Sequence, residues 1–251
     1  MNVVVVDDAE AVGEHGAALV LRSVERDPAL VLGVATGGTP LPVYRALARG
    51  SADFSAVRVV ALDEYVGLPA GHPASFAAYV CHEITEPLGL LAGNVVVPQG
   101  SGQELERRIR ELGGVDLQLL GIGRNGHLAF NEPPSALDSR SRVVALSETT
   151  RRDNARAFGR DPVPTHALTQ GLGTILEARQ LVLLATGAAK ADAVAAALTG
   201  PVTPDCPASV VQLHPRVTVV VDETAAGVVF AGAGERRRSD ADAVPRPPDR
   251  E

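Results

Sequence analysis

The sequence has few of the residues that mark metal-binding, disulfide-rich and membrane proteins. Among its 251 residues there is no tryptophan and there are only two cysteines, Cys81 and Cys206. The cysteines are far apart and lie outside any ligand spacing, so we expect neither a disulfide framework nor a zinc site. No run of about eighteen apolar residues occurs, and no basic segment precedes the apolar residues 3–6. We therefore expect a cytoplasmic protein, with no membrane span and no secretory signal.

Positive charge is also in deficit. Lysine and arginine total 23 against 30 acidic residues, which gives a formal net charge of −7. This balance argues against nucleic acid as a partner. A small anion needs only a local positive site, so a phosphorylated metabolite stays open as a ligand. Lys190 is the single lysine among the basic residues, and it offers a compact, flexible ammonium group that arginine cannot replace.

The apolar pattern predicts strands alternating with helices. We expect strands at 2–6, 30–34, 57–62, 95–97, from 115 into the GIG segment, 142–146, 181–185 and 217–221. We expect helices at 9–26, 40–48, 76–84, 103–112, 150–158, 174–178 and 188–199. The alternation predicts an α/β fold in which helices cover both faces of a mostly parallel sheet. We interpret 1–234 as one domain and 235–251, rich in charge and proline, as a disordered tail.

Four polar segments each follow the carboxyl end of an expected strand. They are residues 36–40, 63–65, 121–132 and 187–190. In a parallel sheet these ends lie on one edge, where ligands of open α/β sheets bind. Residues far apart in the sequence are therefore expected to meet in one site.

The segment ATGGTP is typical of a phosphate site. Its glycines precede an expected helix, whose free backbone N–H groups and positive end attract anions. A lysine in the first turn of another helix would add a full charge, and an arginine offers a two-pronged contact. The candidate phosphate-binding residues are Thr36, Gly37, Gly38, Thr39, Arg156 and Lys190.

The candidate acid and base groups lie in two of the other segments. His127 follows the Asn125-Gly126 turn, and Glu132 lies five residues further on, close enough to orient an imidazole. Asp63 ends an apolar strand and could abstract a carbon-bound proton, whereas Glu64 should face the other way and serve the structure. Each feature also has a structural explanation: a loop histidine, a tight turn, a turn-forming aspartate or a solvated arginine.

Taken together, ATGGTP, LDEYVGLPAGHPAS, GIGRNGHLAFNEP, TRRDNARAF and TGAAKADAV resemble the glucosamine-6-phosphate deaminase family. The resemblance covers about residues 30–224. It implies a Rossmann-like sheet, the conversion of glucosamine 6-phosphate and water into fructose 6-phosphate and ammonia, and no metal or organic cofactor. It also implies that Asp63 moves the C2 proton toward C1, and that His127, oriented by Glu132, opens the sugar ring. The phosphate would be held by the Thr36–Thr39 backbone, Arg156 and Lys190, with Arg156 on a lid.

The sequence departs from the family pattern at two places. Many members have aspartate at the position of Asn125. An asparagine can still form hydrogen bonds there, but it has no charge to stabilise a protonated histidine. In members activated by N-acetylglucosamine 6-phosphate, a hydroxyl residue stands at Ala136 and a lysine at Val144, beside Ser135 and Arg142. We therefore expect little or no activation by this effector.

Three alternative functions stay open from the sequence. A galactosamine-6-phosphate deaminase/isomerase differs only in one epimeric hydroxyl of its substrate. A 6-phosphogluconolactonase shares the fold, although it does not resemble this chain at FNEP and DEYVGL. A sugar-phosphate-sensing regulatory domain would need a DNA-binding segment, which the acidic charge disfavours. The family includes monomers and hexamers, so a homo-oligomer is possible.

Overall fold

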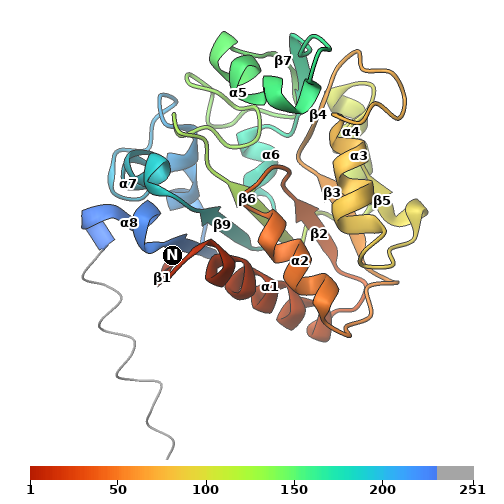
Figure 1. Ribbon diagram of the computed structural model, residues 1–251, viewed down its shortest axis with the longest axis horizontal. Coiled ribbons are helices and arrows are strands. Elements are labelled where there is room, and N and C mark those ends of the chain that lie inside the picture. Colours follow the sequence, from red (N-terminus) through yellow and green to blue (C-terminus); the bar gives the residue numbers. More distant parts are fainter. Residues whose placement is uncertain (231–251) are drawn as a thin grey trace, which may run out of the picture.

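The computed structural model describes residues 1–230, and the expected disordered tail at 235–251 lies outside this range. Strands and helices alternate along most of the described chain (Figure 1). The strands are β1 (Asn2–Val6), β2 (Val31–Val34), β3 (Arg58–Ala61), β4 (Asp63–Tyr65), β5 (Val95–Val96), β6 (Leu117–Gly121), β7 (Arg142–Ala145), β8 (His166–Thr169), β9 (Leu181–Ala185) and β10 (Val217–Asp222). The α-helices are α1 (Ala9–Arg26), α2 (Leu41–Arg49), α3 (Phe76–Val80), α4 (Gly102–Glu111), α5 (Glu148–Phe158), α6 (Leu172–Leu176), α7 (Ala191–Thr199) and α8 (Glu223–Phe230).

Seven of the strands form one parallel sheet, in the order β1-β10-β9-β6-β2-β3-β5. Strands β6 and β2 are neighbours although three strands separate them in the sequence. The strand order runs outward from β2 through β3 to β5 and, on the other side, through β6 to β1. A reversal of this kind opens a crevice at the carboxyl ends of the two central strands.

Helices cover both faces of this sheet, as the sequence predicts. On one face Val20 of α1 and Tyr44 of α2 belong to a buried apolar cluster with side chains from the strands. On the other face the cluster includes Ile109 of α4, Ile175 of α6 and Val194 of α7. Among residues 1–230, no helix is both long and apolar enough to cross a bilayer.

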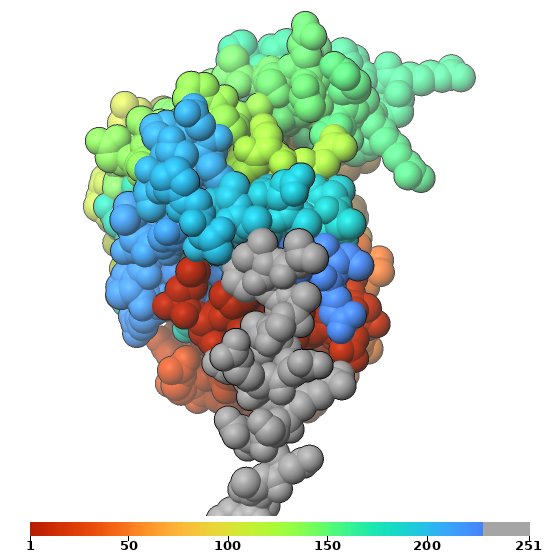
Figure 2. Space-filling model, turned by 90° about the vertical axis from the view of Figure 1, so that its left-hand side faces the viewer, coloured from red at the N-terminus to blue at the C-terminus, as the bar shows by residue number. Residues whose placement is uncertain are grey.

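A second, smaller sheet was not expected from the sequence. Strands β4, β8 and β7 pair antiparallel in that order, with Asp63 opposite Thr169 and Arg142 opposite the same threonine. The predicted edge strand at 142–146 is therefore confirmed, but β8 was missed and residues 63–65 form a strand of their own. Strands β4 and β8 have only three and four residues and pair across about a hundred positions, so they leave no local hairpin signal. The green segment with β7 and α5 lies at the top of the molecule (Figure 1 and Figure 2).

Most of the expected helices begin or end a few residues away from the expected positions, and two of them show why. The helix expected at 40–48 begins at Leu41, and Pro40 is its N-cap. The helix expected at 76–84 is α-helical only to Val80 and continues as a π-helical turn, Cys81–Thr85. Neither difference moves the residues of the expected site.

Candidate active site

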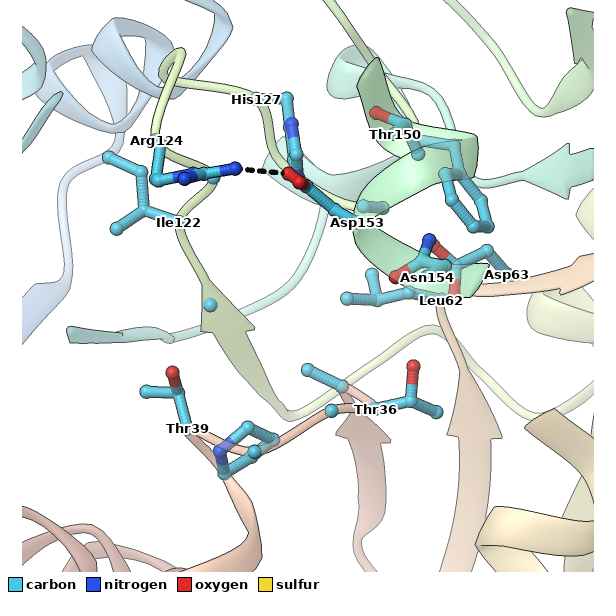
Figure 3. Close-up of a pocket in the computed structure, with 18 of the residues that line it drawn as sticks. Thr36, Thr39, Leu62, Asp63, Ile122, Arg124, His127, Thr150, Asp153 and Asn154 are labelled. Atoms are coloured by element: carbon cyan, nitrogen blue, oxygen red, sulfur yellow. Dashed lines mark hydrogen bonds and ion pairs between the residues drawn. The ribbon is translucent and has the colours of Figure 1, made fainter. Parts of the chain in front are cut away.

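A cavity of about 300 Å³ lies at the carboxyl edge of the parallel sheet. Its walls include residues that follow β9, β6, β2 and β3, which are consecutive neighbours in the sheet. The expectation that four strand ends form one site is thus met. Side chains from α5, the helix between β7 and β8 of the small sheet, also line the cavity (Figure 3).

The segment Thr36–Thr39 follows β2 and forms one wall of the cavity. Its backbone is held from outside by two tyrosines: the Tyr44 hydroxyl donates to the Ala35 carbonyl at 2.6 Å, and the Tyr79 hydroxyl donates to the Gly37 carbonyl at 2.8 Å. Gly37 has φ +98°, a conformation that side-chain-bearing residues adopt only with strain. The loop is fixed through its carbonyls, while Gly37 and Gly38 stay exposed at the cavity.

Asp63 lies at the start of β4 and lines the cavity, with only 5 % of its surface exposed. Burial, together with the negative charge of Glu64, raises its pKa to about 8. Glu64 is directed elsewhere, as the strand pleat predicts. Its carboxylate accepts hydrogen bonds from the backbone N–H groups of Tyr65, Phe76 and Ala77, so it caps the start of α3. Asp63 therefore faces the cavity while its neighbour anchors a helix.

His127 lines the cavity from the loop after β6. Its ring packs directly on Gly123, where an added Cβ would lie 2.3 Å from ring atoms. Burial lowers the pKa of His127, opposed by the charge of Glu132. The Nδ1 atom is buried and has no hydrogen-bond partner in the structure. The ring is thus a neutral imidazole at pH 7, held in place by packing.

Neither Glu132 nor Asn125 is among the residues that line the cavity. Glu132 accepts a hydrogen bond from Ser147 N at 3.4 Å instead of pairing with the His127 ring. Asn125 is exposed and accepts from His127 N at 3.3 Å, which shapes the turn. The orienting contact expected between Glu132 and His127 is therefore not formed in this structure.

Sequence reasoning missed the buried Asn131, which fixes the FNEP segment. Its side-chain amide donates to the carbonyls of Leu128 and Gln170, and its Oδ1 accepts from Arg142. Because Gln170 follows β8, this residue ties the loop to the small sheet. An asparagine in a loop gives no sequence signal for such a role, since surface turns use the same residue type.

Lys190 reaches the cavity from the segment between β9 and α7, as expected. It is partly buried, and burial together with the charge of Arg124 lowers its pKa. Three residues of α5 also line the cavity: Thr150, Asp153 and Asn154. Their spacing of three and four places them on one face of the helix, a signal that could have been read from the sequence.

Arg156 does not reach the cavity in this structure. It stands two residues after Asn154 on α5, which turns it to the opposite side of the helix, and it is exposed. The expected contact of Arg156 with a phosphate would require α5 to move. Arg124, which the sequence analysis did not single out, is at the cavity instead and forms an ion pair with Asp153.

The sequence is similar to many known proteins, among them enzymes from several bacteria. It is 53% identical over 239 residues to the glucosamine-6-phosphate deaminase of Streptomyces avermitilis, covering 90% of this chain and 92% of that one. It is 51% identical over 238 residues to the enzyme of the same name from Cutibacterium acnes, covering 90% and 91%.

Solved structures agree with this similarity. A monomeric glucosamine-6-phosphate deaminase superposes with a TM-score of 0.88 at 38% identity, over 91% of this chain and 100% of that one. The 6-phosphogluconolactonase of Leishmania guyanensis gives a TM-score of 0.73 at 19% identity, over 91% and 98%, and so shares the fold. The sequence model for glucosamine-6-phosphate isomerases/6-phosphogluconolactonase matches residues 7–220. This chain therefore belongs to the glucosamine-6-phosphate isomerase/6-phosphogluconolactonase family.

Proposed function

We propose that this protein is a glucosamine-6-phosphate deaminase, which converts glucosamine 6-phosphate and water into fructose 6-phosphate and ammonia. The observation that carries the proposal is one cavity that brings together a buried carboxyl group, a neutral imidazole and a glycine-rich loop beside a lysine. Sequence identities of 53% and 51% to two glucosamine-6-phosphate deaminases, over 90% of this chain, support the same reaction.

The phosphate end of the substrate is assigned to the wall formed by Thr36, Gly37, Gly38, Thr39 and Lys190. Exposed glycine backbone can approach an anion closely, and the ammonium group of Lys190 supplies a full charge. Arg156 would join this site only if α5 closes over the substrate. Such closure would also exclude water from the reacting carbons.

His127 is assigned to ring opening, because a closed sugar has no acidic hydrogen at C2. In this step a proton moves from the C1 hydroxyl to the ring oxygen, and the bond between C1 and that oxygen breaks. A neutral imidazole can accept the proton of the C1 hydroxyl and can deliver a proton to the ring oxygen. Asn125 shapes the loop that carries the ring, and Glu132 is the nearby carboxylate that favours the protonated ring.

Asp63 is assigned to the transfer of a proton from C2 to C1 of the open sugar. Its raised pKa keeps the carboxyl group protonated at neutral pH in the free protein. The ammonium group at C2 of a bound substrate favours the carboxylate, which can then take the C2 proton. As the C2 proton leaves, one proton of the ammonium group passes to the aldehyde oxygen, which gives an enolamine. Return of the C2 proton to C1 then leaves an iminium group at C2. Addition of water there releases ammonia and the ketose.

The test is ammonia release from purified protein supplied with glucosamine 6-phosphate. Galactosamine 6-phosphate and 6-phosphogluconolactone are supplied in parallel reactions, the second monitored by acid release. The proposal requires fructose 6-phosphate and ammonia in equal amounts from the first substrate, at a kcat/KM higher than for the other two. Lactone hydrolysis without ammonia release from either amino sugar would contradict it.

A further inference from the structure

An ion pair joins two walls of the cavity. Arg124, in the loop that carries His127, lies with its Nη2 atom 2.6 Å from Oδ2 of Asp153 on α5. Figure 3 shows the arginine extending across the gap between the loop and the helix to reach the aspartate. Both residues line the cavity, and each side chain is about half exposed. The pair therefore lies on a part of the cavity wall that solvent reaches.

Asp153 faces more than one positively charged group. Burial lowers the pKa of both Lys190 and His127, and the charge of Asp153 opposes this lowering in each, in addition to its direct contact with Arg124. Arg124 in turn lowers the pKa of Lys190, which shows that the two cations lie within electrostatic range of each other. In the free protein, a carboxylate thus lies among the cations that would otherwise attract an anion.

A phosphate group competes with this carboxylate on favourable terms. It carries up to two negative charges and three acceptor oxygens, and the planar guanidinium group matches it with two parallel hydrogen bonds. The Arg124 contact to Asp153 uses one of the five N–H donors of the side chain. The remaining donors and the exposed position allow the guanidinium to turn toward an anion beside Lys190.

We propose that Arg124 binds the phosphate of the substrate and that Asp153 is the carboxylate which it gives up on binding. The inference rests on the proposed function for the identity of the anion. Asp153 thereby lowers the affinity for phosphate, while Arg124 increases it. Because the exchange frees α5 from the loop after β6, it would also permit the movement that brings Arg156 to the cavity.

The experiment compares the two halves of the ion pair. Binding of inorganic phosphate is measured by calorimetry, and kcat and KM are measured with glucosamine 6-phosphate, for Arg124→Ala, Arg124→Lys and Asp153→Asn. We expect Arg124→Ala to weaken phosphate binding about tenfold and to raise KM by a similar factor with little change in kcat. Arg124→Lys should keep part of the phosphate affinity that Arg124→Ala loses. Asp153→Asn should tighten phosphate binding by about threefold, a small factor because the pair is half exposed.

A matched control is Arg179→Ala. Arg179 pairs with Asp116 at the same 2.6 Å and is 54 % exposed, but neither residue lines the cavity. This variant should leave phosphate affinity and KM unchanged.

The deciding result is that phosphate affinity changes in opposite directions in Arg124→Ala and Asp153→Asn. An ion pair that only stabilises the fold loses the same contact in both variants, so equal shifts in one direction would overturn the inference. Unchanged affinity in Arg124→Ala, or a wild-type protein that does not bind phosphate, would also overturn it. If phosphate binding shifts as expected but no ammonia is released, the proposed function fails while the assignment of Arg124 as an anion-binding residue stands.

Discussion

Asp63 is a buried carboxyl group at the edge of the cavity, placed there by β4. Replacing it with asparagine keeps its shape and removes the base. In Asp63→Asn we expect kcat to fall by about two to four orders of magnitude, while phosphate binding measured by calorimetry persists. A variant with near-normal kcat would remove Asp63 from the reaction.

The same substitution should stabilise the fold in a pH-dependent way. The pKa of Asp63 is about 8 in the folded protein, against an ordinary value of 3.8. Between these two values the folded state binds more protons than the unfolded state, so the contribution of Asp63 to stability is lost as pH rises from about 4 to about 8. Asparagine does not titrate. The Tm of Asp63→Asn should therefore exceed that of the wild type at pH 8, and the gap should shrink toward pH 4.5. A gap that stays constant over this range would contradict the raised pKa.

Lys190 is the single lysine of the chain, and its position at the cavity gives it a specific role to test. Lys190→Ala should raise KM for glucosamine 6-phosphate about tenfold or more, since a charged hydrogen bond is lost. Lys190→Arg should restore little, because the planar fork does not fit a partly buried site built for a compact ammonium group. Equal effects on phosphorylated and phosphate-free ligands in binding assays would rule out a phosphate contact.

At the scale of elements, the loop between β6 and the small sheet positions His127 by packing. Gly123 permits the ring to lie on the backbone, since any side chain at this position would overlap ring atoms. In Gly123→Ala the ring must move, and we expect kcat to fall about tenfold or more, because misplacement of a reacting group by about 1 Å can cost a hundredfold. Circular dichroism should show an intact fold.

Gly93→Ala is the control for this substitution. An added Cβ at Gly93 meets no atom within 4 Å, and the residue does not line the cavity. Its kcat should equal that of the wild type. A loss in Gly93→Ala as large as in Gly123→Ala would show that the effect does not come from His127.

At the scale of the whole molecule, a second cavity of about 360 Å³ lies beside Glu132 and includes Ser135, Arg142 and Val144. The resemblance to activated family members places their effector near these residues. The Ser135 hydroxyl donates to the Glu132 carbonyl at 2.5 Å, and Arg142 donates to Asn131. The Ser135 hydroxyl is thus already used within the chain, Arg142 keeps further N–H donors, and neither Ala136 nor Val144 has a polar side chain.

We therefore expect hyperbolic kinetics with little or no activation by N-acetylglucosamine 6-phosphate. A missing charged contact costs about 1.5–3 kcal/mol, which is comparable to a whole allosteric coupling of about 1–3 kcal/mol. The measurement is the initial rate at substrate well below KM, with and without the effector. A several-fold increase would contradict the expectation.

A homo-oligomer stays a prediction, which sedimentation of the purified protein would test.

The sequence alone determined which segments form the strands of the large sheet and which segments meet at its carboxyl edge. Apolar runs alternate with stretches of helical spacing, and this alternation predicts seven parallel strands. Strand and helix periods are local properties of the chain, so the sequence shows them directly. Polar residues directly after those runs had to meet at one edge, since parallel strands share their carboxyl ends. Asp63, His127, Lys190 and the Thr36–Thr39 segment are therefore together in the structure, as expected.

Only the tertiary structure decided how α5 and the small sheet complete the cavity. Strands β4 and β8 pair across about a hundred residues, so no local pattern shows them. The pairing and the loops around it set the rotation of α5, which turns Asp153 and Asn154 into the cavity and Arg156 away from it. The contact between Arg124 and Asp153 depends on the same placement. Pairings between distant segments are chosen by packing and charge in three dimensions, which a one-dimensional pattern does not contain.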